Sequence, residues 1–210
     1  MSLFMPKLSK GNHKTGRSVL TYSRLPGVTC PGMSPFCQGI VAGIAGLKGL
    51  ACYAGQAVAQ YKQTFAQWSY NANVEMAPEL PAPKRNGKRT LLRIHVSGDF
   101  TSIAYIHSWI AVLENRPDVT AWAYTRSWRD SELRDTLEKL RALPNVQLFA
   151  SMDPTISETP PEGWRVAWIL PDTRAGNAFP CPAQTGRKAD CVACRFCLDG
   201  KRNDVAFVEH

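Results

Sequence analysis

The stretch LLRIHVSGDF, residues 91–100, joins a nearly continuous apolar run to an abrupt polar end. Such a run is typical of a strand that is buried on both faces of a parallel sheet. In parallel α/β architectures, the carboxyl ends of the strands carry the active site. At this end, Gly98 permits a tight exit or the close approach of a ligand, and Asp99 is suited to accept hydrogen bonds or act as a general base. The structural alternative is that Asp99 or Thr101 caps the helix that follows.

Strands and helices alternate after this stretch. Further strands are expected at residues 119–124, 146–151 and 164–170, and apolar residues at helical spacing predict helices within 101–117 and 130–144. The alternation predicts an α/β fold with a parallel, partial or full barrel-like core. An irregular, cysteine-rich, metal-binding C-terminal segment is expected to follow this core.

The part of the chain before residue 89 is expected to be irregular to helical. One helix is predicted from about residue 37 to 50, and a second runs through residues 54–76. In the second, four apolar residues recur at helical spacing, which indicates the helix. These residues are Val58, Tyr61, Phe65 and Trp68.

Length and hydropathy limit the class of protein. A chain of 210 residues is long enough for one substantial domain. We expect an N-terminal loop and helix region over 1–88, an α/β repeat core over 89–172 and a cysteine-rich tail over 173–210, integrated in one domain. No apolar run reaches the roughly 18 residues of a membrane span, and the start lacks the pattern of a signal peptide. A cytoplasmic protein that does not bind a membrane is therefore expected.

Basic residues exceed acidic ones and give a formal net charge of +8. Many of them gather in two clusters, one near the start and one in the stretch PKRNGKRT. Such clusters suit the phosphate backbone of a nucleic acid, and the alternative is that they are solvated loops. The residues expected to contact nucleic acid are Lys10, Lys14, Arg17, Lys84, Arg85, Lys88 and Arg89.

Four of the seven cysteines lie near the C-terminus in a C-x9-C-x2-C-x2-C pattern, formed by Cys181, Cys191, Cys194 and Cys197. Clustered cysteines in a reducing cytoplasm indicate metal ligands rather than disulfides. Four thiolates complete either a tetrahedral zinc site or a 4Fe–4S cluster. In both cases the site can serve simply as a staple for the tail.

The other three cysteines, Cys30, Cys37 and Cys52, lie near the N-terminus. Three thiolates on a 4Fe–4S cluster leave one iron open to a substrate or cofactor, which a purely structural site does not need. The alternative is that these cysteines are small buried apolar residues.

Two more strand ends carry polar residues. Arg126 follows the strand expected at 119–124, and Asp153 follows the strand expected at 146–151. Side chains at successive strand ends are expected to face one shared pocket with Asp99. In this pocket, Arg126 is suited to hold a phosphate or a carboxylate.

Several motifs together resemble the phage Gene product 88 family. They are SKGNHKTG, TCPG followed by CYA, RIHVSGDF, AYTRS and the closing cysteine run, and the likeness spans nearly the whole chain. The order of the cysteine triad, basic loop and strands is more distantly similar to phage three-Cys-motif proteins. These proteins are in turn similar to radical S-adenosylmethionine enzymes of the spore-photoproduct-lyase type.

The more distant resemblance implies specific roles. Cys30, Cys37 and Cys52 would hold a 4Fe–4S cluster whose open iron binds S-adenosylmethionine, and residues 97–99 would contact that cofactor. The cofactor-contacting residues are Ser97, Gly98 and Asp99. The four C-terminal cysteines would hold an auxiliary cluster or a zinc ion. The triad departs from the C-x3-C-x2-C spacing usual in that superfamily, because it reads C-x6-C-x14-C and therefore carries an insertion.

Three functional hypotheses follow. The first is an iron–sulfur protein of the radical S-adenosylmethionine type that acts on nucleic acid or a nucleotide in the host cytoplasm, with an electron donor or protein partner. In it, Asp99, Arg126 and Asp153 would position cofactor or substrate. The second is a zinc-containing, transglycosylase-like enzyme of DNA base modification, with Asp99 or Asp153 as nucleophile or base. The third is a non-enzymatic, metal-stapled DNA-binding protein.

Overall fold

The architecture rests on one eight-stranded sheet. It is seen in a computed structural model, which describes residues 5–38, 52–200 and 203–208. The strands are β1 (Ser9–Lys10), β2 (Leu20–Thr21), β3 (Thr90–Arg93), β4 (Val119–Thr125), β5 (Val146–Met152), β6 (Arg165–Leu170), β7 (Phe179–Pro180) and β8 (Val205–Val208). The helices are α1 (Tyr53–Gln60), α2 (Lys62–Ala72), α3 (Ile103–Glu114), α4 (Ser131–Arg141) and the short α5 (Cys191–Cys194).

The sheet is mostly parallel and open. Its strand order is β1-β2-β3-β4-β5-β6-β8-β7, and only the edge pair β1–β2 is antiparallel. Both edge strands are two residues long, and they are not paired with each other in the described part of the chain. The expectation of a full barrel is therefore wrong. Closing an eight-stranded parallel barrel takes eight successive strand–helix repeats, and this chain has too few.

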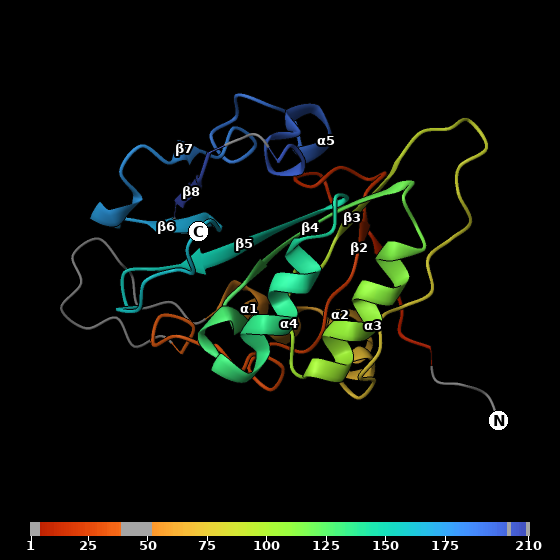
Figure 1. Cartoon of the computed structure of the whole chain (residues 1–210), viewed down its shortest axis with the longest axis horizontal. Helices are drawn as coiled ribbons and strands as arrows, with labels where there is room; N and C mark the ends of the chain where they lie inside the picture. The colour runs from red at the N-terminus through yellow and green to blue at the C-terminus, as the bar shows by residue number, and fades with distance from the viewer. Residues whose placement is uncertain (1–4, 39–51, 201–202, 209–210) are drawn as a thin grey trace.

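The two faces of the sheet are covered differently (Figure 1). Since side chains alternate between faces along a strand, Leu92 and Ile94 point into the main core, where α3 and α4 pack. Leu91 and Trp122 point to the opposite face, where Leu198 and the rest of the cysteine-rich tail cover them. We call this second face the inner face.

The central repeat agrees with the sequence prediction. The strands expected at 119–124, 146–151 and 164–170 are β4, β5 and β6, and the two expected helices are α3 and α4. The apolar stripe of α4 is buried as predicted, with Leu133, Leu137 and Leu140 all in the main core. The first strand, β3, ends at Arg93, since His95 has a positive φ of 54° that is incompatible with a strand.

The single helix predicted over 54–76 is instead two helices. Tyr61 has extended backbone angles (φ −119°, ψ 104°) and separates α1 from α2. Tyr61 is 55% exposed and Phe65 is 50% exposed, so these two apolar side chains lie outside the core. The buried residue of α2 is Asn71, which donates to the carbonyls of Lys7 and Ser23 and thereby ties α2 to the start of the chain. The helix predicted at 37–50 lies mainly outside the described residues.

The tail is more regular than the sequence indicates. It contributes β7 and β8, and β8 pairs in parallel with β6 from Val205 to Val208. Val205 is fully buried against the inner face, which explains why this apolar segment joins the sheet. None of the described helices is long and apolar enough to span a membrane.

Candidate functional site

The polar exit of β3 holds the segment that leads to the first cysteine. Ser97 and Arg24 are joined by two hydrogen bonds, one from the Arg24 amide to the Ser97 carbonyl (2.9 Å) and one from the Ser97 hydroxyl to the Arg24 carbonyl (2.9 Å). The Asp99 amide donates to the carbonyl of Thr29 (2.9 Å). Gly98 has a φ of +76°, and a Cβ there would lie 2.6 Å from the Thr29 hydroxyl. Gly98 thus allows two parts of the backbone to lie close together, and the part that lies against it is the segment with Arg24 and Thr29.

Asp99 is a structural acceptor in this arrangement. Its Oδ1 accepts from the Phe100 amide (2.8 Å) and the Thr125 hydroxyl (2.6 Å). Its Oδ2 accepts from the amides of Arg126 (2.7 Å) and Ser127 (3.2 Å). Burial raises the pKa of Asp99, and these hydrogen bonds oppose that rise. Asp99 therefore fixes the backbone that follows β4.

The capping role suggested for Asp99 or Thr101 belongs to another residue. Ser102 is the N-cap of α3, and its hydroxyl accepts from the Tyr105 amide (3.2 Å). The alternative stated for Asp99 and Thr101 is therefore wrong. Thr101 instead accepts from Arg24 Nη1 (2.6 Å) and donates to Glu75.

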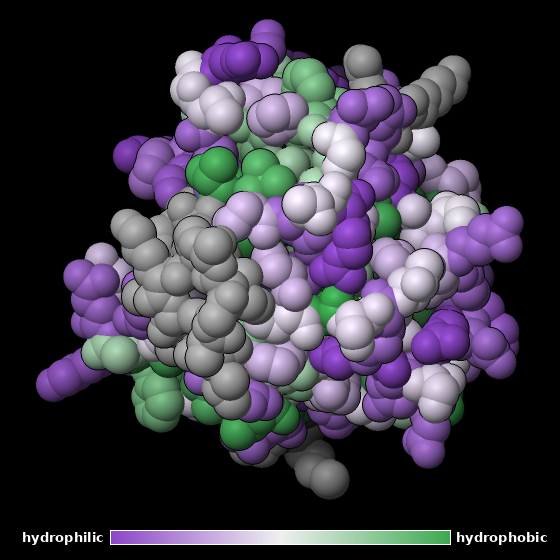
Figure 2. Space-filling model, turned by 90° about the vertical axis from the view of Figure 1, so that its left-hand side faces the viewer, coloured by the Kyte–Doolittle hydropathy of each residue, from purple (hydrophilic) through white to green (hydrophobic). Residues whose placement is uncertain are grey.

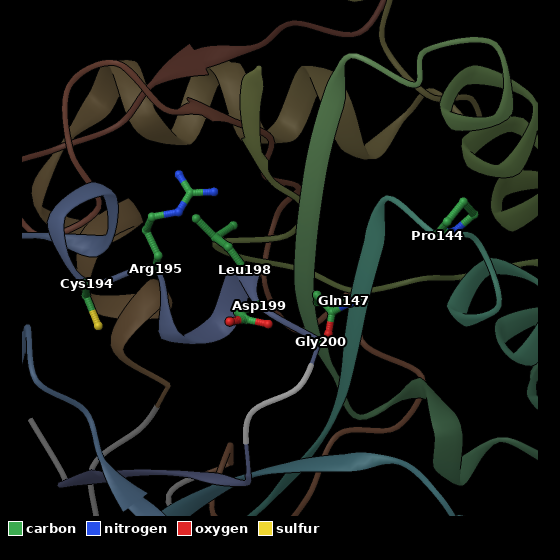
Figure 3. Close-up of a pocket in the computed structure, with 7 residues that line it drawn as sticks. All are labelled: Pro144, Gln147, Cys194, Arg195, Leu198, Asp199 and Gly200. Atoms are coloured by element: carbon green, nitrogen blue, oxygen red, sulfur yellow. The ribbon is translucent and has the colours of Figure 1, made fainter. Parts of the chain in front are cut away.

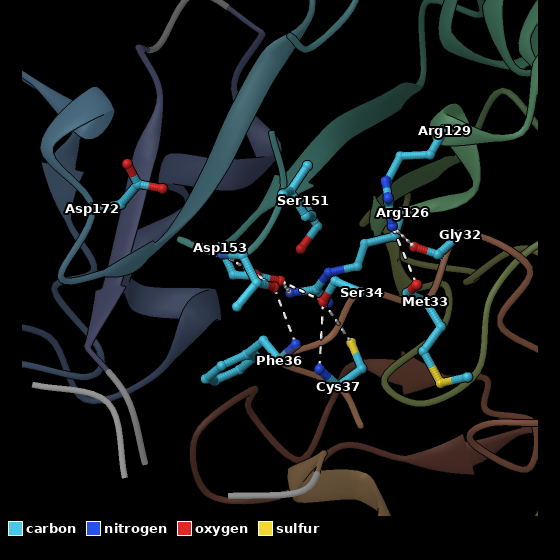
Figure 4. Close-up of polar contacts among 12 residues, drawn as sticks. Gly32, Met33, Ser34, Phe36, Cys37, Arg126, Arg129, Ser151, Asp153 and Asp172 are labelled. Carbon is cyan, nitrogen blue, oxygen red and sulfur yellow. Dashed lines mark hydrogen bonds and ion pairs between the residues drawn. The ribbon is translucent and has the colours of Figure 1, made fainter. Parts of the chain in front are cut away.

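The ends of β4 and β5 meet in a network that includes a cysteine (Figure 4). Arg126 Nη2 donates to Asp153 Oδ2 (2.9 Å), and the Ser34 hydroxyl donates to the same oxygen (2.7 Å). That hydroxyl also lies 3.4 Å from Cys37 Sγ. Thr155 donates to Asp153 Oδ1 through its amide (2.9 Å) and its hydroxyl (2.5 Å). Although burial opposes it, the Arg126 charge and these hydrogen bonds hold the pKa of Asp153 below its ordinary value.

The predicted shared pocket of strand-end residues is thus a connected set. Asp99 holds the backbone of Arg126, and the side chain of Arg126 holds Asp153. Every oxygen of both carboxylates already accepts hydrogen bonds. A role for Asp99 or Asp153 as nucleophile or base would require these bonds to break, so the geometry favours positioning roles for both.

The loop between Cys30 and Cys37 is held against the end of β4. A Cβ on Gly32 would lie 1.8 Å from the carbonyl oxygen of Arg126, so only glycine fits here. Arg129 Nη1 donates to the carbonyls of Gly32 (3.0 Å) and Met33 (3.2 Å). Arg129 is itself paired with Glu158 (2.6 Å). The loop is therefore fixed at its backbone.

The three N-terminal cysteines lie near one another at this end of the sheet. The Cys52 amide donates to the Cys37 carbonyl (3.2 Å). Burial is the main cause that raises the pKa of the Cys30 thiol to about 12, and the Asp99 carboxylate, Cys52 and Cys37 add to the rise. The sequence prediction that these cysteines share one site is therefore compatible with the fold. We call them the triad.

We call the four C-terminal cysteines the quartet, and three of them, Cys181, Cys191 and Cys197, pack against the inner face. The Tyr124 hydroxyl lies 2.9 Å from Cys197 Sγ, and the Cys191 amide donates to the Lys14 carbonyl (3.1 Å). Burial is the main cause that raises the pKa of Cys191 to about 12 and that of Cys197 to about 11. Within residues 5–38, 52–200 and 203–208, no group of three or more His, Cys, Asp or Glu side chains is already arranged to hold a metal ion. Metal binding would require the thiols to lose their protons.

The raised thiol pKa values predict slow alkylation of the metal-free protein. Only the thiolate reacts, so the iodoacetamide rates at Cys30 and Cys191 should rise with pH to an inflection far above pH 9, towards about 12. Peptide mass spectrometry after timed labelling measures these rates site by site. The control is the same protein unfolded in urea, whose thiols should titrate at about 8.5. An inflection near 8.5 in the folded protein would show that burial does not protect these thiols.

Both basic clusters lie at the opposite, N-terminal edge of the strands (Figure 1). Lys10 ends β1, and Lys14 and Arg17 lie in the loop between β1 and β2; all three are exposed. This loop packs against the quartet, because a Cβ on Gly16 would lie 2.5 Å from Val192 Cγ2. The second cluster precedes β3, and its exposed members are Lys84, Arg85, Lys88 and Arg89.

Arg89 has a structural role within the second cluster. Its Nε donates to the Thr120 hydroxyl (2.6 Å) and its Nη2 donates to the Val119 carbonyl (2.8 Å), at the start of β4. These bonds place the second cluster beside the N-terminal ends of β3 and β4. Among the four basic residues of this cluster, Arg89 therefore fixes the position of the loop.

A cavity of about 660 Å³ also opens at this edge, beside the quartet (Figure 3). It is lined by Pro144, Gln147, Cys194, Arg195, Leu198, Asp199 and Gly200. None of the predicted catalytic residues lines this cavity. The face toward which the strand ends point is different in character, with separate hydrophobic patches among mainly hydrophilic side chains (Figure 2).

Sequence reasoning missed several residues of the site. Ser34, Gly32 and Arg129 fix the triad loop, and Tyr124 contacts the quartet. Arg93 could have been singled out from the sequence, since an arginine inside an otherwise apolar strand is unusual in a sheet that is covered on both faces. The others depend on contacts between segments far apart in sequence.

Comparisons with known proteins identify relatives of the chain. The family model described as Gene product 88 matches residues 6–202. The "Gene 88 protein" of Mycobacterium phage L5 is 26% identical over 208 residues, covering 84% of this chain and 81% of the relative. The "Gene 88 protein" of Mycobacterium phage D29 is 29% identical over 130 residues, covering 54% of this chain and about half (52%) of the relative. No solved structure matches the chain.

Proposed function

The chain belongs to the Gene product 88 family, and we propose that it is an iron–sulfur enzyme whose reactive centre is held by the triad. One observation carries the proposal. The fold brings Cys30, Cys37 and Cys52 to the carboxyl ends of parallel strands, where they lie beside the buried network of Arg126 and Asp153. Three thiolates and no fourth protein ligand are the donor set of a 4Fe–4S cluster with one open iron.

We propose more specifically an enzyme of the radical S-adenosylmethionine type, which the order of the triad loop and residues 97–99 along the chain supports. The triad loop follows β2, the first parallel strand, and residues 97–99 follow its neighbour β3. This order agrees with the resemblance drawn from the sequence. When bound, such a cluster supplies the one-electron reductive cleavage of S-adenosylmethionine, with the electron coming from an external donor.

The chain's own residues would position the reactants. Asp99 and Gly32 fix the backbone against which the triad loop rests. Within the described residues, the buried Nε of Arg126 has no hydrogen-bond partner, while Nη2 is held by Asp153. That unpaired N–H is suited to orient an oxygen of a carboxylate or phosphate close to Cys37.

The function is tested by anaerobic turnover. Reduced protein is incubated with S-adenosylmethionine, and 5′-deoxyadenosine is measured by mass spectrometry. The proposal predicts that the wild type forms 5′-deoxyadenosine and that a Cys30→Ala/Cys37→Ala/Cys52→Ala variant forms none. The Cys181→Ala variant is the matched control for the loss of a thiol. Equal amounts from wild type and the triad variant would reject the proposal.

We further propose that the substrate is a nucleic acid that binds along the N-terminal edge. In support, Lys10, Lys14, Arg17, Lys84, Arg85 and Lys88 are all exposed on that one edge of the sheet. Each phosphate contact made by a basic side chain steepens the salt dependence of binding.

A salt titration tests this binding edge. Replacing Lys84 and Lys88 by alanine should lower the slope of log K against log salt by about 2, since each lost contact removes about 0.9. The matched control replaces Lys62 and Lys139, which are exposed on α2 and α4, and should leave the slope unchanged. Fluorescence anisotropy with a labelled duplex measures both. An equal change in the two double variants would argue against this edge.

The basic edge also favours a second candidate, a non-enzymatic DNA-binding protein stapled by metal at the quartet. This candidate predicts the same salt dependence but no product from S-adenosylmethionine. The zinc-containing transglycosylase has less support, because both oxygens of Asp99 and of Asp153 are already engaged.

A further inference from the structure

Arg93 lies on the inner face in an unusual environment. It is the last residue of β3, and its guanidinium carbon lies 3.9 Å from the centroid of the Tyr124 ring and 5.9 Å from that of Trp122. Stacking of this kind holds one face of the guanidinium and leaves its N–H edges directed outward in the plane. The position of the side chain is therefore fixed, and its donors are not used by the stacking.

The donors of Arg93 have no acceptor in the described part of the chain. Its Nε is inaccessible to solvent and makes no hydrogen bond, and none of the six ion pairs involves it. Arg165, on the same face, offers a direct comparison. Arg165 also stacks on an aromatic ring, Phe149 (4.3 Å), but it donates to the main-chain carbonyls of Phe196, Asp199 and Asn203.

A half-buried guanidinium without an anion is costly, because it loses hydration and gains no compensating charge. Stacking on Tyr124 offsets part of this cost, and a charge-assisted hydrogen bond to an oxyanion would offset more. The planar donor pattern of arginine matches the two oxygens of a carboxylate or phosphate. We propose that Arg93 anchors an anion-binding site on the inner face, which takes the phosphate or carboxylate group of a ligand lying between the triad and the quartet.

Contacts on both sides of Arg93 support this placement. On one side, Arg93 stacks on Tyr124, whose hydroxyl lies 2.9 Å from Cys197 Sγ of the quartet. On the other side, the carbonyl of Val96, three residues after Arg93, accepts a hydrogen bond from the hydroxyl of Tyr53, which follows Cys52 of the triad. A ligand anchored here would approach both cysteine sets, which is what a substrate or cofactor of the proposed enzyme needs.

The site does not depend on the proposed function, because its test uses metal-free protein. Isothermal titration with inorganic phosphate, and separately with acetate, identifies which oxyanion is preferred at constant ionic strength set by sodium chloride. We expect saturable binding of one of them by the wild type. Arg93→Met should weaken that binding about ten- to hundred-fold, the loss of one charge-assisted interaction.

Two further variants make the outcome interpretable. Arg93→Lys keeps the charge but not the paired donors, so it should fold like the wild type and still bind the oxyanion more weakly. Lys139→Met removes one positive charge from the exposed face of α4, which has no assigned binding role, and should bind as the wild type does. The proposal is overturned if neither anion binds the wild type, or if Arg93→Met and Lys139→Met bind equally well. It is also overturned if Arg93→Met changes only the metal content at the quartet, since Arg93 would then serve the thiolates.

Discussion

Replacing Asp99 with alanine should destabilise the protein by about 3–5 kcal/mol. The carboxylate is 5% exposed and accepts four hydrogen bonds, three of them from main-chain amides at the starts of two loops. Its removal leaves the amides of Phe100 and Arg126 without their acceptor, while the Ser127 amide keeps only the Thr125 hydroxyl (2.9 Å). Urea denaturation followed by circular dichroism measures the free energy of unfolding.

The control for this prediction is Asp118→Ala. Among the described residues, the Asp118 carboxylate pairs with Arg116 alone (2.7 Å), and both side chains are partly exposed, so its loss should cost about 1 kcal/mol or less. The comparison also separates two roles of Asp99. If the Asp99 variant is as stable as the Asp118 variant but inactive, Asp99 is a catalytic base after all, and the structural role assigned to it here is wrong.

Replacing Gly32 with alanine should displace the triad loop and abolish iron binding there. The added Cβ would lie 1.8 Å from the Arg126 carbonyl oxygen and 2.9 Å from the Ser127 amide nitrogen. Neither group can yield, because Asp99 holds the amides of both residues. Since the loop is the part able to move, we expect a loss of about 1–3 kcal/mol together with loss of iron at the triad.

Gly55→Ala is the matched control for the Gly32 variant. Gly55 lies in α1, close in sequence to Cys52, and a Cβ there meets no atom within 4 Å. This substitution should be neutral or stabilise α1 by up to about 1 kcal/mol, with iron content unchanged. Iron analysis and thermal unfolding of the two variants side by side give the answer. Full iron content in the Gly32 variant would mean that the docked loop is not needed for the site.

The central repeat of the fold could be predicted because its signals are local. The stripe of Leu133, Leu137 and Leu140 and the apolar runs of β4 and β5 are visible in the sequence and are confirmed. The short strands β2 and β8 could not be predicted, because short segments become strands only through pairing with distant neighbours. The break at Tyr61 has no glycine or proline to mark it.

The candidate site was predicted as a set of residues but not as a set of roles. Spacing and residue type identified Asp99, Arg126 and Asp153, and the structure connects them. Their roles depend on contacts across 27 residues of sequence or more, such as Arg126 with Asp153 or Ser34 with Asp153. The same holds for the contact of Tyr124 with Cys197, which links the quartet to the sheet. Long-range hydrogen bonds of this kind leave no pattern in a single sequence.

The central claim is that the triad holds an iron–sulfur cluster, and the iron and acid-labile sulfide content of anaerobically purified protein tests it most directly. With both cysteine sets occupied by clusters, the wild type should contain about eight irons per chain, or about four if the quartet takes zinc. The Cys30→Ala/Cys37→Ala/Cys52→Ala variant should contain about four fewer in either case. A colourless protein that contains only zinc, or a triad variant with the iron content of the wild type, would contradict the account.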